Sequence, residues 1–428
     1  MTNEPLFTSR REFLSGGLTI LSAAATLPIF LGHTARALAG DEPTSKPVKD
    51  QPILVVVQLA GGNDGLNTIV PFEMDAYYKS RPRLAIPKKD VLKLEGGVGL
   101  HPAAVGLKDL FDEGRMAVIQ GVGYPNPNRS HFTSMDIWHT ADPTQKTQEG
   151  WIGKYFDSCC KGSDPDPVMG VALMQEQPLA MQGDRFMPLA FENPDSLTWR
   201  GGKNDKAADA AFRKLNGLGD GSAAIDDDDR KVAQYLQRAA LKAQLGAEEI
   251  KSAAGRTTTG RARRAGGGNQ LSQQLQLVAR LIAADMPTRI YYVSMGGFDT
   301  HTGQEGRHRT LMTQFAEAMR EFLDTLQNQK LLDRVMVMSF SEFGRRVQEN
   351  ASGGTDHGEA APMFLFGNKV RAGVHMKHPS LDDLHRGDLQ FSCDFRRVYA
   401  SVLTDWMKVR TNDVLGRGFE PLPVIVKA

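Results

Sequence analysis

Four loops of this 428-residue chain carry acidic or imidazole side chains next to short apolar segments. The side chains concerned belong to Asp64, Asp299, His301, Glu342 and His357. Carboxylate oxygens and imidazole nitrogens together suit zinc, manganese or iron, whereas calcium prefers oxygen ligands alone. These residues therefore predict a divalent metal site, with zinc or manganese as the expected ion.

Each of these residues also has an ordinary structural explanation. Asp299 and His301 lie two positions apart, so an extended chain points both side chains to the same side. Neighbouring ligands require this arrangement, but so does a His–Asp pair that only holds a loop together. Asp64 lies in a sequence that forms tight turns, and Glu342 is either a ligand or the N-cap of a following turn. The metal hypothesis therefore depends on the loops meeting in space.

The apolar segments next to these loops have the length of buried strands. Such runs occupy residues 53–59, 116–122, 289–293, 335–340 and 363–366. Helical patterns alternate with them at residues 105–113, 132–139, 274–285, 307–326 and 394–406. Continuous apolar runs are typical of parallel strands buried on both faces, and the alternation predicts an α/β fold with helices on both faces of a mostly parallel sheet. Ligands bind beyond the carboxyl ends of such strands, so we expect the loops to meet at one edge.

Two weaker patterns complete the predicted fold. Short mixed runs at 168–174 and 186–191 predict strands of a peripheral subregion. Residues at about 195–270 are low in apolar content, apart from a stretch with helical composition, and predict a partly helical, partly mobile insertion. The remaining residues of 40–428 are expected to form one domain around this insertion.

A serine and two arginines near the loops could take part in chemistry. Ser130 follows a turn-rich segment and precedes the predicted helix 132–139. The N-terminus of a helix favours an anion and assists a hydroxyl nucleophile, although an ordinary N-cap serine explains this residue equally well. Arg129 and Arg345 could balance the charge of a transferred group, or could pair with acids.

The first 39 residues predict a signal peptide for twin-arginine export. Ser9-Arg10-Arg11-Glu12-Phe13-Leu14 precedes an uncharged stretch at 18–31, and Ala37-Leu38-Ala39 offers a cleavage site. We therefore expect contact with the twin-arginine translocase and a periplasmic or extracellular location. The alternative is an uncleaved N-terminal anchor, for which the stretch is short. No later segment of the sequence predicts a membrane span.

The charge and cysteine content exclude other classes of protein. The chain has 51 basic and 50 acidic residues, and the signal segment contains three of the former and two of the latter. The charge of the rest is therefore balanced, which argues against binding to nucleic acid or to an anionic membrane surface. Three cysteines cannot form a disulfide framework.

Five motifs together resemble a known family. They are Gln58–Asn67, Tyr124–His131, Gly296–His301, Ser341–Arg345 and Gly354–Gly358. They closely resemble a large family of uncharacterised bacterial proteins exported by the twin-arginine route, whose members are similar to the alkaline phosphatase and sulfatase superfamily. The resemblance implies a mixed, mostly parallel sheet, two metal ions at the strand ends and a Ser or Thr nucleophile at a helix N-terminus.

The resemblance assigns roles to individual residues. Ser130 resembles the nucleophile, and His357 resembles the last histidine of the first metal site. Asp299 and His301 resemble the Asp-x-x-x-His pair of that site, with a shorter spacing.

The second metal site departs from the superfamily pattern. Glu342 and Phe343 stand where Asp-His is expected, and Asp64 is displaced from the end of the first strand. The sulfatase signature Cys/Ser-x-Pro-x-Arg is absent, so a formylglycine sulfatase is not expected.

The sequence as a whole predicts an exported, metal-assisted hydrolase of phosphate or sulfate esters. Asp299, His301 and His357 would hold one ion, with Asp64 and Glu342 near a second position, and the substrate would be a small-molecule or polysaccharide ester. One alternative is a non-catalytic exported binding or assembly protein with the same fold. A carbohydrate-binding surface protein would need exposed aromatic side chains near the site.

Overall fold

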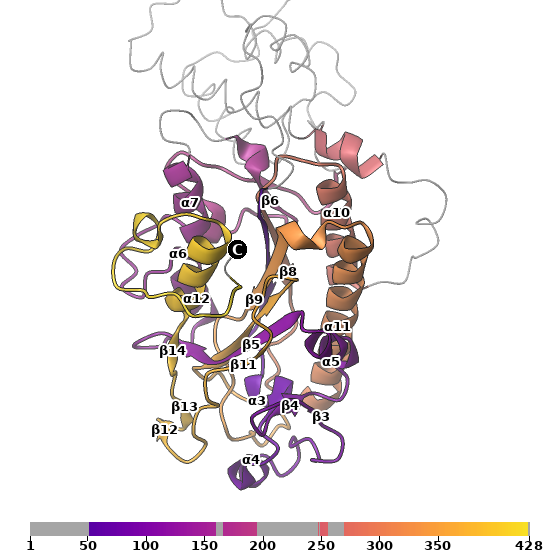
Figure 1. The fold of residues 1–428 in the computed structure, drawn as a ribbon. Helices are drawn as coiled ribbons and strands as arrows, with labels where there is room; N and C mark the ends of the chain where they lie inside the picture. The colour runs from indigo at the N-terminus through magenta and orange to yellow at the C-terminus, as the bar shows by residue number, and fades with distance from the viewer. Residues whose placement is uncertain (1–50, 160–165, 195–246, 248, 256–268, 427–428) are drawn as a thin grey trace, which may run out of the picture.

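A mixed, mostly parallel sheet forms the centre of the protein (Figure 1). The computed structural model describes residues 51–159, 166–194, 247, 249–255 and 269–426. Within these ranges the sheet has nine strands, and the strand order is β11-β5-β10-β9-β1-β8-β6-β7, with β14 also beside β5. The long central strands are β1 (Ile53–Leu59), β5 (Met116–Gly123), β8 (Ile290–Met295), β9 (Val335–Phe340) and β10 (Ala361–Phe366). The short strands are β6 (Gly170–Ala172), β7 (Leu189–Ala190), β11 (Gly373–His375) and β14 (Cys393–Asp394).

Strand β10 is the antiparallel strand of this sheet. It pairs antiparallel with both β9 and β5, whereas β1 pairs parallel with β8 and β9. The amino end of β10 therefore lies at the same edge of the sheet as the carboxyl ends of β1, β8 and β9. A loop that precedes β10 thus meets loops that follow the other three strands.

Helices cover both faces of the sheet, as the sequence predicts (Figure 1). One face carries α5 (Val105–Asp112), α10 (Gln270–Ala283) and α11 (Gln304–Asn328), and the other carries α6 (His131–Thr140), α7 (Trp151–Cys159) and α12 (Phe395–Ser401). Successive side chains of a strand point to opposite faces. Val55 and Val57 accordingly belong to the core under α10 and α11, and Leu54 and Val56 to the core under α6 and α12.

Smaller elements extend the fold beyond one end of the central sheet (Figure 1). A three-stranded sheet has the order β2 (Ile69–Val70), β4 (Gly99–Leu100), β3 (Leu92–Lys93), and the helices α3 (Gly65–Thr68) and α4 (Asp75–Ser80) lie near it. A short hairpin pairs β12 (Leu384–His385) with β13 (Asp388–Leu389).

Most predicted elements are confirmed, with changes at their ends. The runs 53–59 and 335–340 coincide with β1 and β9. The terminal helix begins as predicted, because the Asp394 side chain accepts the backbone N–H of Arg396, but it becomes π-helical at Val402–Trp406. The strands expected at 168–174 and 186–191 are shorter and are not peripheral, because β6 pairs with β8 and extends the central sheet.

Several predictions concern residues outside the described ranges. The signal peptide at 1–39 lies there, and so does most of the insertion expected at 195–270. Within the described ranges, no helix combines the length and apolarity that crossing a membrane requires.

Candidate metal centre

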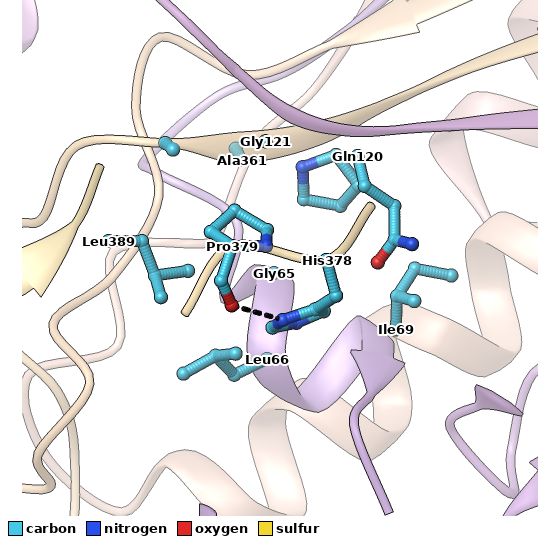
Figure 2. A pocket seen from close by; sticks show the side chains of 11 residues that line it. Gly65, Leu66, Ile69, Gln120, Gly121, Ala361, His378, Pro379 and Leu389 are labelled. Carbon is cyan, nitrogen blue, oxygen red and sulfur yellow. Dashed lines mark hydrogen bonds between the residues drawn. The ribbon is translucent and has the colours of Figure 1, made fainter. Parts of the chain in front are cut away.

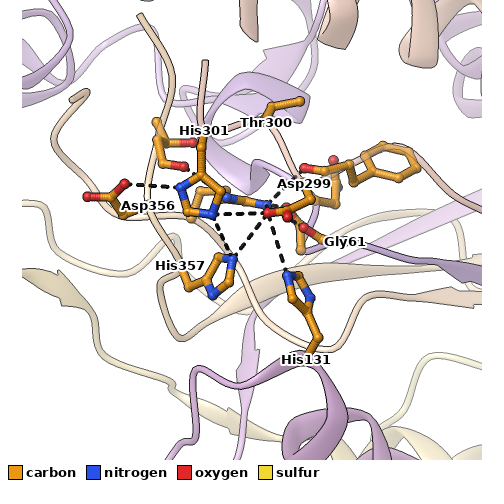
Figure 3. Close-up of polar contacts among 12 residues, drawn as sticks. Gly61, His131, Asp299, Thr300, His301, Asp356 and His357 are labelled. Carbon is orange, nitrogen blue, oxygen red and sulfur yellow. Dashed lines mark hydrogen bonds and ion pairs between the residues drawn. The ribbon is translucent and has the colours of Figure 1, made fainter. Parts of the chain in front are cut away.

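Four side chains from distant parts of the chain converge at this edge of the sheet (Figure 3). Asp299 and His301 follow β8, His357 precedes β10, and His131 is the first residue of α6. The Oδ1 atom of Asp299 lies 3.1 Å from the Nε2 atoms of His301 and His357 and 3.5 Å from Nε2 of His131. The structure therefore brings together three of the predicted ligands and adds His131.

The ring nitrogens of His301 and His357 face each other, an arrangement that suits a shared cation when both nitrogens present lone pairs. Their Nε2 atoms lie 2.9 Å apart. His357 donates its Nδ1–H to the carbonyl oxygen of Arg129 at 2.8 Å, and Nδ1 of His301 faces the Asp356 carboxylate at 3.2 Å. Because each Nδ1 atom faces an acceptor, it carries the proton of the neutral ring, and both Nε2 atoms present lone pairs.

His131 has the same arrangement. Its Nδ1 atom lies 2.8 Å from Oε1 of Glu342, so its Nε2 atom also presents a lone pair when the ring is neutral. That Nε2 atom is buried and has no hydrogen-bond partner. Buried polar atoms without partners are rare in proteins, and an unplaced ion is one of the recognised reasons.

The spacing of these donors fits a zinc-type ion. Ligands at about 2.0–2.1 Å from a tetrahedral ion are separated from one another by roughly 3.3 Å. The four separations given above run from 2.9 to 3.5 Å. Within the described residues, the group of metal-type donors whose ligand atoms all lie within 4.8 Å of one another consists of His131, Asp299 and His357, without His301. Each histidine has an oxygen acceptor behind it, which is typical of metal ligands.

Glu342 supports the centre from outside rather than joining the converging donors. Its Oε1 atom accepts the backbone N–H of Gly61 at 2.8 Å and faces His131, and its Oε2 atom accepts the Ser341 hydroxyl at 3.1 Å. Its side chain is 2% exposed. The structure therefore assigns to Glu342 the orientation of His131, in place of the predicted direct contact with a second ion.

Asp64 lies in a different buried cluster. Its Oδ2 atom pairs with Nη1 of Arg81 at 2.6 Å, and both side chains are fully buried. Burial alone would raise the pKa of Asp64, but the Arg81 guanidinium beside it holds that pKa below its usual value. We do not retain Asp64 as a ligand, because its charge is already paired with an arginine.

Arg345 connects the loops of the centre to one another. Its buried guanidinium donates to the carbonyl oxygens of Gly62 at 2.7 Å, Thr355 at 2.8 Å and Phe298 at 3.1 Å, and to Asp299 Oδ1 at 2.6 Å. Burial raises the pKa of Asp299, but the hydrogen bond and the charge of the Arg345 guanidinium lower it more, so the carboxylate stays ionised. Arg345 thus holds the loops together and pairs with an acid, which is one of the two alternatives that the sequence left open.

Arg129 and Ser130 lie at the start of α6. The Arg129 guanidinium pairs with Glu359 at 3.3 Å and with Asp388, so its charge is balanced within the protein. The predicted role of Arg129 in binding a transferred group therefore has no support in this geometry. Ser130 occupies the predicted N-cap position, but its side chain makes no capping hydrogen bond and is exposed.

The loop after β1 approaches the centre through two glycines. Gly61 has a φ of +118°, and a Cβ atom there would lie 2.4 Å from the backbone nitrogen of Asp299. Gly62 has a φ of +76°, and its Cβ atom would lie 2.4 Å from the Phe343 ring. Only glycine fits such positions. Phe343 in turn packs against His131 and His357, with ring centroids 4.9 and 4.7 Å away.

This geometry explains an apparent gap in the sequence pattern. The resemblance leads one to expect a histidine of the second metal site where Phe343 stands. In the structure, His131 from α6 brings an imidazole to the same centre, and Phe343 packs beside it. The signal for His131 was its place next to Ser130 at a helix start, which the metal hypothesis did not use.

A separate small cavity has no connection with this chemistry (Figure 2). It has a volume of about 20 Å³, and its lining includes Gln120, His378 and Pro379. That volume accommodates about one water molecule. The cavity is therefore too small to be a substrate site.

Comparison with known proteins identifies the family. Residues 117–409 match the model of a family described as "Protein of unknown function (DUF1501)". The chain belongs to this family. No curated protein matches it in sequence.

Several solved structures are similar to this chain at low identity. A PsFucS1 sulfatase from Pseudoalteromonas sp. is 9% identical, with 87% of this chain and 69% of that chain covered and a TM-score of 0.33. A protein of the alkaline phosphatase superfamily from Vibrio parahaemolyticus is 10% identical, with 87% and 72% covered and a TM-score of 0.32. Alkaline phosphatase from the Antarctic bacterium TAB5 is 11% identical, with 74% and 92% covered and a TM-score of 0.29. Such values carry no information about activity.

Proposed function

We propose that this DUF1501 protein is exported, binds a divalent transition metal ion, and hydrolyses phosphate or sulfate esters. The observation that carries the proposal is the convergence of three imidazole nitrogens on one carboxylate oxygen, at separations of 3.1–3.5 Å. Zinc or manganese is the expected ion, because the donor set mixes nitrogen with a single carboxylate.

The residues around the centre would divide the work. A bound ion would polarise an ester oxygen and lower the pKa of a nearby hydroxyl. Ser130 would supply the attacking hydroxyl, since it is exposed, makes no capping bond and precedes His131 in the chain. The side chains of Asp299 and His301 are 47% and 41% exposed, so an ester attached to a large molecule could reach the centre.

Metal analysis combined with an ester panel tests this proposal. We expect close to one equivalent of zinc or manganese in the protein isolated from the periplasm or culture medium of the cells that express it. His357→Ala should lose that metal. His375→Ala is the matched control, because this imidazole contacts the carbonyl oxygen of Arg371 and lies outside the centre. Ser130→Ala should keep the metal and lose hydrolysis. A wild-type protein without bound metal would refute the metal centre. Full hydrolysis in Ser130→Ala would refute the role of Ser130 as nucleophile.

One observation favours a second candidate, a non-catalytic exported binding or assembly protein. His131, Asp299 and His357 form a group of mutually close donors, and His301 lies next to two of them, so little room is left for a substrate on a bound ion. Shells filled by protein ligands are typical of structural zinc sites. The ion would then hold the loops after β8 and before β10 to α6. Metal-loaded protein that hydrolyses no ester of the panel, yet loses thermal stability on chelation, would support this candidate over the hydrolase.

A further inference from the structure

Gln304 connects the two loops that carry three of the four converging donors. It is the first residue of α11 and is fully buried. Its Oε1 atom accepts the hydroxyl of Thr300 at 2.9 Å and the hydroxyl of Thr355 at 2.6 Å. Thr300 lies between Asp299 and His301, and Thr355 lies two residues before His357. An amide oxygen has two lone pairs, and both are used here.

The other end of the Gln304 amide is fixed by Asp64. Its Nε2 atom donates a hydrogen bond to Oδ2 of Asp64, the carboxylate that also pairs with Arg81. An ionised carboxylate only accepts hydrogen bonds, so it forces the NH2 group of Gln304 toward itself and the oxygen toward the threonines. Thr355 N–H also donates to the carbonyl oxygen of Thr300 at 3.1 Å, so both loops are tied at one point.

We propose that Gln304 is a positioning residue, which sets the spacing between the Asp299–His301 loop and the His357 loop, and that Asp64 fixes its direction. This inference rests on the metal centre of the proposed function. His301 and His357 must hold their Nε2 atoms close together for both to bind one ion, and outer partners of this kind determine how precisely ligands are held. It also gives Asp64 a place in the centre without contact with the ion.

Exchanging the amide of Gln304 and the carboxylate of Asp64 tests whether the hydrogen bond between them orients Gln304. Gln304→Glu can still accept from both threonines, but its second oxygen faces the Asp64 carboxylate. Asp64→Asn removes the carboxylate that orients Gln304 and pairs with Arg81. In the double variant Asp64→Asn/Gln304→Glu, the new amide donates to the new carboxylate, which still accepts from both threonines. Arg81 Nη1 loses the acceptor that Asp64 Oδ2 provides, but the negative charge stays nearby on residue 304. Packing hardly changes, because all substitutions are nearly isosteric.

Cobalt(II) titration of the metal-free protein gives the readout, because its visible absorption bands report both affinity and coordination geometry. We expect each single variant to bind cobalt about 10- to 100-fold more weakly and with altered bands. The double variant should recover the wild-type bands and most of the affinity. Gln274→Glu is the control: this glutamine is also buried, donates to the carbonyl oxygen of Leu173 at 2.7 Å, and does not contact the centre. It should destabilise the fold and leave the cobalt spectrum unchanged.

A double variant no better than the single ones would overturn the inference. If the charged variants do not fold, Thr355→Val should weaken cobalt binding and Thr355→Ser should preserve it, and equal effects would overturn it as well. Hydrogen exchange at the Thr355 amide, measured without metal, separates this inference from the proposed function. Wild-type protein that binds no cobalt would refute the proposed function. Faster exchange of the Thr355 amide in each single variant, with the wild-type rate restored in the double variant, would still support the positioning role of Gln304. An unchanged exchange rate would reject that role.

Discussion

The support that Glu342 gives to His131 allows a quantitative prediction for Glu342→Gln. A glutamine oxygen in the place of Oε1 can accept both the Gly61 N–H and the His131 Nδ1–H, which the carboxylate accepts at 2.8 Å each. The amide NH2 would take the place of Oε2, and the Ser341 hydroxyl can donate instead to the carbonyl oxygen of Leu59 at 2.7 Å. The substitution therefore removes the negative charge and preserves the geometry.

The magnitude follows from that difference. Loss of an outer partner of a metal ligand weakens metal binding about 10- to 100-fold, which corresponds to about 1.4–2.8 kcal/mol. Glu342→Gln keeps the orientation of His131, so we expect the lower end of this range. Glu342→Ala also leaves the His131 and Gly61 donors without an acceptor, at about 1–3 kcal/mol for each buried group, so it should reach the upper end and lower stability as well.

Zinc competition against a chromogenic chelator measures these affinities. Asp157→Asn is the matched control, because this carboxylate also accepts a backbone N–H, that of Asp184 at 2.7 Å, but belongs to α7 and does not contact the centre. Wild-type zinc affinity in Glu342→Gln, Glu342→Ala and His131→Ala alike would show that His131 is not a ligand, and the reasoning from its unpartnered Nε2 atom would be refuted.

Three more outcomes can be checked independently. Gly61→Ala should reduce the free energy of unfolding by at least about 1–3 kcal/mol in denaturant titrations, because of its φ of +118° and the 2.4 Å approach to Asp299, whereas Gly296→Ala, with no atom within 4 Å of its Cβ position, should have little effect. Burial lowers the pKa of His139 to about 3, so the unfolded chain binds a proton more readily. The contribution of His139 to stability is therefore complete above its unfolded pKa of about 6.5 and declines by up to about 1.4 kcal/mol per pH unit as the pH falls toward 3; unfolding measured between about pH 6 and pH 4 should depend less on pH in His139→Gln. Zinc added to the chelated wild type at 100 times its Kd should stabilise the protein by about 2.7 kcal/mol in thermal unfolding, and the same addition should leave His357→Ala unchanged.

The sequence predicts the central strands well because their residues satisfy one strong requirement. Strands β1 and β9 are buried along their whole length, and all but one of the side chains in each are apolar and either β-branched or long. Strands β6 and β7 are two or three residues long, so their pattern is too short to place them in the central sheet. The length of an apolar run thus determines how much it can predict.

The direction of β10 was harder to predict from an apolar run. A parallel return after β9 needs a crossover of a dozen or more residues, usually with a helix. Residues 341–360 contain no helix and are rich in glycine and polar residues, which is a signal for an antiparallel return that the sequence analysis did not use. The direction matters for function, because it brings His357 to the edge where Asp299 and His301 follow β8.

Prediction from residue type and position at a strand end identified the converging donors, but it also included residues that have structural roles. Asp64, Glu342 and Arg345 have the right chemistry, but their hydrogen bonds and ion pairs are made within the protein. His131, His301 and His357 differ in having an acceptor behind Nδ1 and a lone pair in front at Nε2. A sequence cannot show which polar atoms remain without a partner, because this depends on contacts between segments more than 50 residues apart, such as that between His301 and Asp356. An unpartnered Nε2 atom that lies beside another ligand-type side chain, as in His131 next to Asp299, therefore marks the place where an ion would bind, rather than the residue type alone.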